Sequence, residues 1–135
     1  MPKHGAAGTP NAELHPAIAA LGIAHHFKKG QYSAAYSGFE GIEDNTDCIQ
    51  TREEVTAEQS AGKTLANALK AAGVTQVDVV GIAESHCVKD TALDAKRLGF
   101  DVTVFEDLTV PVSEELGVAA RKQMADAGII LAEAR

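Results

Sequence analysis

The chain has 135 residues, and its 12 Lys and Arg residues against 19 Asp and Glu residues give a formal net charge of −7. This length holds one domain at most, and a hydrophobic content of 45% is typical of a globular chain rather than a disordered or fibrous one. The acidic balance, with no local cluster of Lys and Arg, disfavours nucleic-acid and membrane-surface partners. Because aromatic residues make up only 4%, the core must come from Ala, Val, Ile and Leu, as in alternating α/β folds.

Two cysteines, Cys48 and Cys87, are too few for a disulfide framework, and no charged-then-apolar leader precedes them. No apolar run approaches the roughly 18 residues that a membrane span needs. These features predict a soluble protein of the reducing cytoplasm.

The first 57 residues are irregular, with one short strand predicted near 23–28 and a polar stretch over 37–56. From residue 58 onward, helical periodicity alternates with short runs rich in Val and Ile, which indicates parallel βαβ units in a single α/β domain over residues 1–135. The predicted elements are a helix over 58–72, a strand over 77–83, a helix over 87–98, a strand over 101–106, a helix capped by Ser113, and a strand over 129–132. We expect the mostly apolar strand over 77–83 to be buried on both faces of the sheet.

Cys87 follows a predicted strand within four residues and opens a predicted helix. The amino terminus of a helix stabilises a thiolate, so this position suits a cysteine nucleophile; a small buried hydrophobe is the alternative that position alone leaves open. Cys48 lies in a polar segment without such a setting, and we interpret it as incidental. The histidines form no recognised metal-ligand spacing; they are His4, His15, His25, His26 and His86.

Six segments resemble sequence blocks of the nicotinamidase/pyrazinamidase family, which belongs to the isochorismatase-like cysteine hydrolases. They are His4–Pro16, Phe27–Gly30, Ala35–Phe39, Val79–Val88, Thr91–Ala95 and Asp107–Thr109. These blocks stand in the same order and at similar spacing as in the family, and the resemblance covers the whole chain. The Gly-Thr-Pro element within the first block and the Tyr-Ser-Gly-Phe element within the third favour this family over isochorismatases in general.

The resemblance implies a three-layer α/β/α fold with a parallel sheet and a cytoplasmic enzyme of NAD salvage. It also implies hydrolysis of nicotinamide, and of pyrazinamide, through a cysteine thioester that releases ammonia. By position, Cys87 matches the nucleophile and Lys29 its triad partner. Ile82–Ala83 matches a cis peptide bond that directs the backbone N–H of Ala83, together with that of Cys87, at the developing oxyanion.

The same resemblance implies a divalent metal ion, Zn, Fe or Mn, that binds the pyridine nitrogen of the substrate and holds water. His4 matches one of its histidine ligands, and Tyr36 and His86 match residues that line the pocket. Three positions depart from the family pattern: Gly5 replaces a cysteine, Asn11 replaces a glycine, and Glu84-Ser85 replaces the common Thr-Asp pair.

The family's general-base Asp and its other metal ligands precede the block that begins here at His4, and no Asp of this chain matches that base. The missing first strand belongs beside the strand ending at Ala83, which we expect to be left with an unpaired apolar edge. We therefore hypothesise a carboxyl-terminal portion of a nicotinamidase, inactive alone or completed by a second copy or a complementing chain. The remaining alternative is a related cysteine amidohydrolase acting on other amides.

Overall fold

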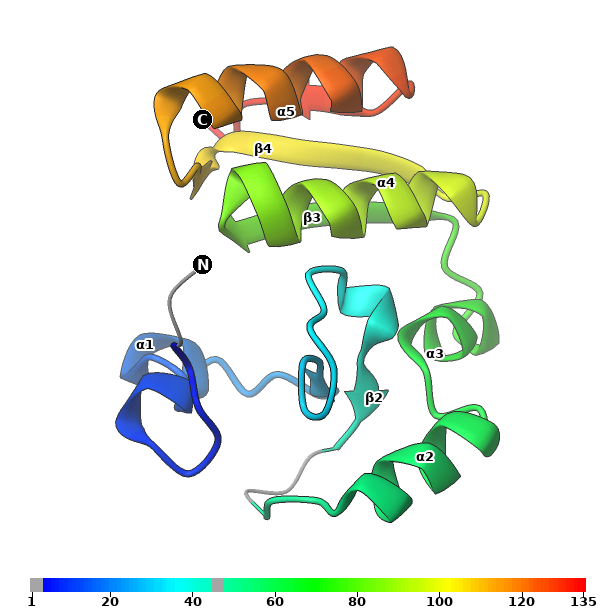
Figure 1. Ribbon diagram of the computed structural model, residues 1–135. Helices are drawn as coiled ribbons and strands as arrows, with labels where there is room; N and C mark the ends of the chain where they lie inside the picture. The colour runs from blue at the N-terminus through cyan, green and yellow to red at the C-terminus, as the bar shows by residue number, and fades with distance from the viewer. Residues whose placement is uncertain (1–3, 45–47) are drawn as a thin grey trace.

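A computed structural model of the chain describes residues 4–44 and 48–135. Figure 1 shows a carboxyl-terminal layer of strands and helices, with an amino-terminal half of short elements on the β3 side of the sheet. The described part of the chain has no helix with the length and apolarity that crossing a bilayer requires.

Three strands form the main sheet: β3(Gln76–Ile82), β4(Asp101–Val110) and β5(Ile130–Ala132), in the order β3-β4-β5. Both pairs are parallel, with Val79 opposite Val104 and Val104 opposite Leu131. Parallel neighbours need a crossover connection, which is a helix in each case here. The parallel βαβ units expected from residue 58 onward are therefore confirmed for the segment from β3 to β5.

Two helices make these crossovers, α4(Lys89–Arg97) and α5(Glu114–Asp126). Ser113 caps α5 as expected, because its side chain accepts a hydrogen bond from the backbone N–H of Leu116. Gly99 follows α4 with a φ of 97°, a left-handed conformation that suits glycine at the end of a helix. The local signals in the sequence thus set the ends of both helices.

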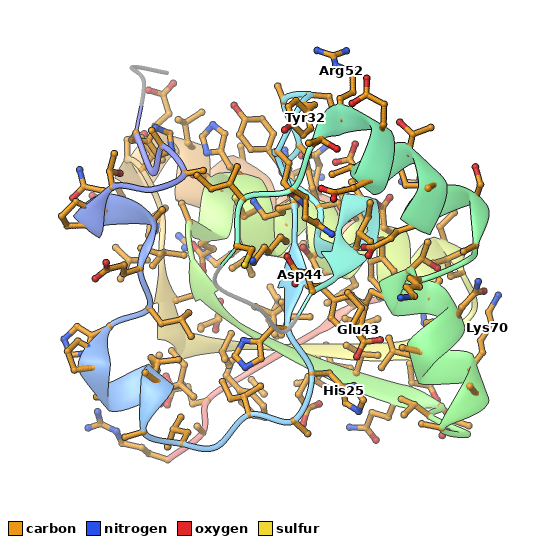
Figure 2. The ribbon with its side chains drawn as sticks, turned by 90° about the horizontal axis from the view of Figure 1, so that it is seen from below. His25, Tyr32, Glu43, Asp44, Arg52 and Lys70 are labelled. Atoms are coloured by element: carbon orange, nitrogen blue, oxygen red, sulfur yellow. The ribbon has the colours of Figure 1, made fainter. Side chains whose placement is uncertain are left out.

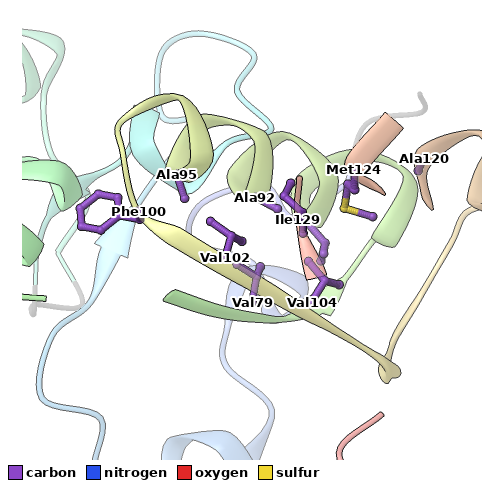
Figure 3. Close-up of a cluster of buried hydrophobic side chains, with 10 residues drawn as sticks. Val79, Ala92, Ala95, Phe100, Val102, Val104, Ala120, Met124 and Ile129 are labelled. Atoms are coloured by element: carbon purple, nitrogen blue, oxygen red, sulfur yellow. The ribbon is translucent and has the colours of Figure 1, made fainter. Parts of the chain in front are cut away.

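The hydrophobic core lies between one face of this sheet and the two helices (Figure 3). Its buried members are Val79, Val88, Ala92, Ala95, Phe100, Val102, Val104, Ala120, Met124 and Ile129. The completely buried alanines of α4 have short side chains, which let the helix approach the strands closely. Small aliphatic side chains therefore make most of the core, as the low aromatic content predicted.

The other face of β3 corrects one expectation. The strand is not buried on both faces, since Val80 is 52% exposed and Ile82 is 75% exposed. Val110 of the neighbouring strand is also 62% exposed. Side chains of a strand alternate between faces, so Val77 and Val79 pack on the core, while Val80 lies on the opposite face. Among the described residues β3 also lies at the edge of its sheet, so its outer hydrogen-bonding edge has no strand partner there.

The predicted helix over 58–72 is also wrong, because the structure has two helices, α2(Arg52–Ser60) and α3(Leu65–Ala71). Gly62 stands between them with a φ of 78°, which ends the first helix, and the side chain of Thr64 caps the second. Helical periodicity continued through this break in the sequence, so spacing alone did not reveal it.

Three further boundaries differ from the predictions. The strand expected near 23–28 is the two-residue β1(Phe27–Lys28), which pairs antiparallel with β2(Ile42–Glu43). The helix expected from residue 87 begins earlier, as the π-helix η3(Glu84–Val88), which leads into α4. The strand over 101–106 continues to Val110. The remaining elements are short: η1(Pro10–Ala12), α1(Pro16–Ala19) and η2(Gly38–Glu40).

Candidate active site

Cys87 lies in η3, immediately beyond the carboxyl end of β3, and its side chain is partly buried and not in a disulfide. The carboxyl ends of parallel strands are where open α/β sheets place their ligand sites. The π-helical turn continues directly into α4, so the thiol stands at the beginning of a longer helical segment. Cys87 thus follows a strand and leads into a helix, as the sequence predicted; its role as the nucleophile stays a prediction.

Lys29 comes from the other half of the molecule and contacts this thiol. Its Nζ donates to the Sγ of Cys87 over 3.3 Å and to the carbonyl oxygen of Ala35 over 3.2 Å. The two residues are 58 positions apart in the sequence, so only the fold brings them together. The lysine thus places its side-chain nitrogen within hydrogen-bond distance of the candidate nucleophile.

The loop that follows Lys29 is docked onto α4. The backbone N–H of Gly38 donates to the Oγ1 of Thr91 over 2.8 Å, and the rings of Phe39 and Phe100 stack with centroids 6.4 Å apart. Ser37 and Glu40 form a capping box that fixes the turn η2. These contacts hold the lysine loop beside α4, the helix that follows Cys87.

The Ile82–Ala83 peptide bond is cis, at the position that the resemblance gave for it. The Ala83 carbonyl accepts hydrogen bonds from the N–H groups of both His86 and Val88, each over 3.1 Å. This carbonyl therefore closes the turn around Cys87. A role for the Ala83 N–H in binding an oxyanion stays a prediction.

Tyr36 and His86 form an aromatic pair, and His86 directly precedes Cys87 in the sequence. Their ring centroids are 5.2 Å apart and the rings meet edge to face at 64°. The Oγ of Ser85 lies 2.9 Å from Nδ1 of His86 and accepts the backbone N–H of Val112 over 3.0 Å. The resemblance gave both residues as lining the pocket; the structure brings their two rings together, and a role in binding substrate stays a prediction.

Sequence reasoning missed one pair in this region. Glu84, only 1% exposed, accepts a hydrogen bond from Nη1 of Arg121 over 2.5 Å. The Nε of the same arginine lies 3.9 Å from a carboxylate oxygen of Glu106. The buried pair joins η3 to α5 across 37 positions of sequence, so neither residue signalled its partner; Glu84 stood out only as a departure from the family pattern.

The described residues do not fit a metal site. Within 4–44 and 48–135 there is no group of three or more His, Cys, Asp or Glu side chains that could hold a metal ion. His4 is exposed, and a zinc ion in a protein takes at least three ligands. The pair of His25 and Glu43 seen from below in Figure 2, with Nδ1 and Oε1 2.8 Å apart, provides only two.

No carboxylate in the described part of the chain makes a hydrogen bond or an ion pair with Cys87 or Lys29. The contacts that the structure gives these two groups are with each other and with the Ala35 carbonyl.

The sequence matches the Isochorismatase domain family over residues 1–135. The chain belongs to this family. It is 42% identical over 130 residues to the nicotinamidase/pyrazinamidase of Mycobacterium tuberculosis, a match that covers 96% of this chain and 61% of that protein. The fold is accordingly the isochorismatase-like α/β fold, with its parallel sheet and flanking helices.

Two solved structures are similar over most of the chain. The Acinetobacter baumanii nicotinamidase/pyrazinamidase matches with a TM-score of 0.65 and 30% identity, over 98% of this chain and 58% of that one. The pyrazinamidase of Pyrococcus horikoshii in complex with zinc matches with a TM-score of 0.57 and 32% identity, over 75% of this chain and 45% of that one. The chain thus spans about three fifths of the length of the M. tuberculosis relative, and less of these two structures.

Proposed function

We propose that this chain carries the nucleophile of a nicotinamidase, which hydrolyses nicotinamide to nicotinate and ammonia, with pyrazinamide as a second substrate. The observation that carries the proposal is the 3.3 Å contact between Lys29 and Cys87 at the carboxyl end of β3. The similarity to the M. tuberculosis nicotinamidase/pyrazinamidase supports the choice of substrate. The proposal includes a cytoplasmic location and a part in NAD salvage, which the family implies.

In the first half of the proposed reaction, the Cys87 thiolate attacks the carboxamide carbon and forms a C–S bond. The carbonyl oxygen becomes an oxyanion, for which the N–H groups of Ala83 and Cys87 are the proposed donors. When the tetrahedral intermediate collapses, the C–N bond breaks. Lys29, which contacts the sulfur, gives a proton to the departing amine, so that ammonia leaves and a thioester remains.

In the second half, water adds to the thioester and the amine of Lys29 takes its proton. The C–S bond then breaks, the carboxylic acid leaves, and the thiolate–ammonium pair is restored. We propose that the paired rings of Tyr36 and His86, the residue before Cys87, contact the flat aromatic amide. We assign no step to a metal ion, because the described residues lack a ligand set, although the P. horikoshii neighbour was crystallised with zinc.

A second candidate is a chain that does not catalyse the reaction by itself and needs a second copy or a complementing chain. The absence of a carboxylate beside Lys29 and Cys87 in the described residues favours it, as does the exposure of Val80 and Ile82 on β3. A positioned proton-transfer group contributes about 10² to 10⁴ in rate, so a site that relies on Lys29 alone is expected to be slower by roughly that factor.

Ammonia release from nicotinamide by the purified 135-residue chain, with and without added Zn²⁺ or Mn²⁺, separates the two candidates. The proposal predicts slow release that Cys87→Ala abolishes and that Cys48→Ala, a matched change at the exposed cysteine, leaves unchanged. A folded chain whose release equals that of Cys87→Ala would support the second candidate and overturn the first.

A further inference from the structure

We propose that Arg121 is a positioning residue for Cys87, and that it acts through the buried carboxylate of Glu84. The inference rests on the proposed function only in that it concerns the same nucleophile. It starts from the turn η3, which begins immediately after Ala83 with Glu84 and carries Cys87 three residues later.

The helix α5 holds this turn at two polar points. Arg121 donates to Glu84 over 2.5 Å, and the N–H of Val112, just before the cap of α5, donates to the Oγ of Ser85 over 3.0 Å. The side chain of Glu84 is 2% exposed, whereas that of Arg121 is 31% exposed. The carboxylate therefore depends on this arginine for its partner, while the arginine retains some access to water.

A buried carboxylate without a partner is strongly unfavourable, and its charge opposes a second negative charge nearby. Without Arg121, Glu84 and Glu106 would be left as two carboxylates facing the same space, one of them in the turn of the nucleophile. Glu84 could then take up a proton, draw the turn toward water or oppose the Cys87 thiolate. We propose that the last two responses contribute, because they change the thiol that the turn carries and not the core alone.

The pair also explains why a charged residue is tolerated at position 84. The neighbouring Val88 is 3% exposed and belongs to the hydrophobic core, so η3 packs against apolar side chains. An apolar residue would satisfy this burial without any ion pair. The charged pair also fixes the orientation of η3 relative to α5, because a carboxylate and a guanidinium group meet in a defined geometry.

The experiment compares three variants, Arg121→Met, Glu84→Gln and the double variant that combines these two changes. The control variant is Lys122→Met. Lys122 is the matched control, because it is the next residue of α5 and pairs with Asp126 at the exposed surface. The first readout is the rate at which iodoacetamide alkylates Cys87 in the folded protein at neutral pH, followed by peptide mass spectrometry so that Cys48 does not contribute. The second readout is kcat and KM for nicotinamide.

We expect Arg121→Met to slow the alkylation of Cys87 and to lower kcat by roughly tenfold each, with little change in KM, a rate factor that corresponds to about 1.4 kcal/mol. The double variant is expected to recover to within roughly threefold of the parent, because it removes the buried charge together with its partner. Glu84→Gln alone and Lys122→Met are expected to stay within the same threefold range.

Unchanged alkylation in Arg121→Met would overturn the proposal, and so would equal slowing in the single and double variants, because a loss that the neutral pair does not relieve is only structural. If Arg121→Met does not fold, Arg121→Gln and the double variant give the same comparison, since the glutamine also removes the cation while it can still donate a hydrogen bond. Alkylation needs no turnover, so a chain that fails to hydrolyse nicotinamide still tests the role of Arg121.

Discussion

The two halves of the candidate active site are held in different ways. Cys87 stands on a turn between β3 and α4, above a continuous core that includes Val79, Ala92 and Met124. Lys29 follows a strand of two residues, in a half of the chain where nearly every residue from 4 to 25 is exposed. The turn of Cys87 is thus held by core packing together with two polar contacts, whereas Lys29 is held by a few hydrogen bonds and one aromatic stack in its loop. Changes in the two halves should have different consequences.

The largest effect on activity is expected from the contact that joins the halves. Lys29→Met removes the cation beside the thiol and the proposed proton donor, so ammonia release should fall by about 10² to 10⁴ without loss of the folded state. Lys70→Met, at an exposed lysine of α3, is the control and should leave the rate unchanged. A Lys29→Met variant that keeps the parent rate would show that the reaction does not need the contact between Lys29 and Cys87.

The largest effect on stability is expected in the half of the chain that carries Cys87, called the nucleophile half below. Met124 is completely buried, so Met124→Ala should lower the free energy of unfolding by about 2–5 kcal/mol. Leu21→Ala, a truncation at a side chain that is 69% exposed, should change it by less than about 0.5 kcal/mol. Denaturant titration measures both, and equal losses would mean that the amino-terminal half is packed as tightly as the core.

A smaller effect is expected where the lysine loop docks. Thr91→Val keeps the shape of the side chain but leaves the N–H of Gly38 without its acceptor, at a cost of about 1–3 kcal/mol. Hydrogen exchange should become faster at Gly38 and in the turn η2, while the amides of β4 keep their protection. Faster exchange throughout β4 would show that the loop and the core open together.

The smallest effect is expected at Lys122. A hydrogen bond and the charge of Asp126 raise the pKa of Lys122 above its ordinary value of 10.5, at a fully exposed position. Because the raised pKa belongs to the folded state, its stabilisation is complete below pH 10.5 and is lost as the pH rises through the folded value. Thermal unfolding of Lys122→Met should differ little from the parent at pH 7, and that small difference should shrink further above pH 10.5.

The sequence predicted the nucleophile half better than the other half, and for physical reasons. Ser113 and Gly99 are local signals that act on their own helix, and the apolar runs of β3 and β4 identify strands without knowledge of their neighbours. The break at Gly62 was missed because helical spacing continues on both sides of it. Burial of Val80 and Ile82 was predicted wrongly, because composition does not say which face of a strand is covered.

The residues of the candidate site also differ in how well the sequence predicted them. The placement of Cys87 could be predicted from a strand followed by a helix, whereas the contact of Lys29 was expected only from the resemblance to a family. The pair of Glu84 and Arg121 could not be predicted, because it depends on how α5 packs against η3. Long-range polar pairs need the fold before they can be seen.

The most direct test of the proposed chemistry is to look for the covalent intermediate. The chain is mixed with nicotinamide, quenched in acid and digested, and the peptide containing residue 87 is examined by mass spectrometry. A nicotinoyl thioester on Cys87 that is absent from Cys87→Ala and strongly reduced in Lys29→Met is the predicted result. A folded chain that releases ammonia with no adduct on Cys87, even after rapid quenching, would contradict the assignment of the nucleophile.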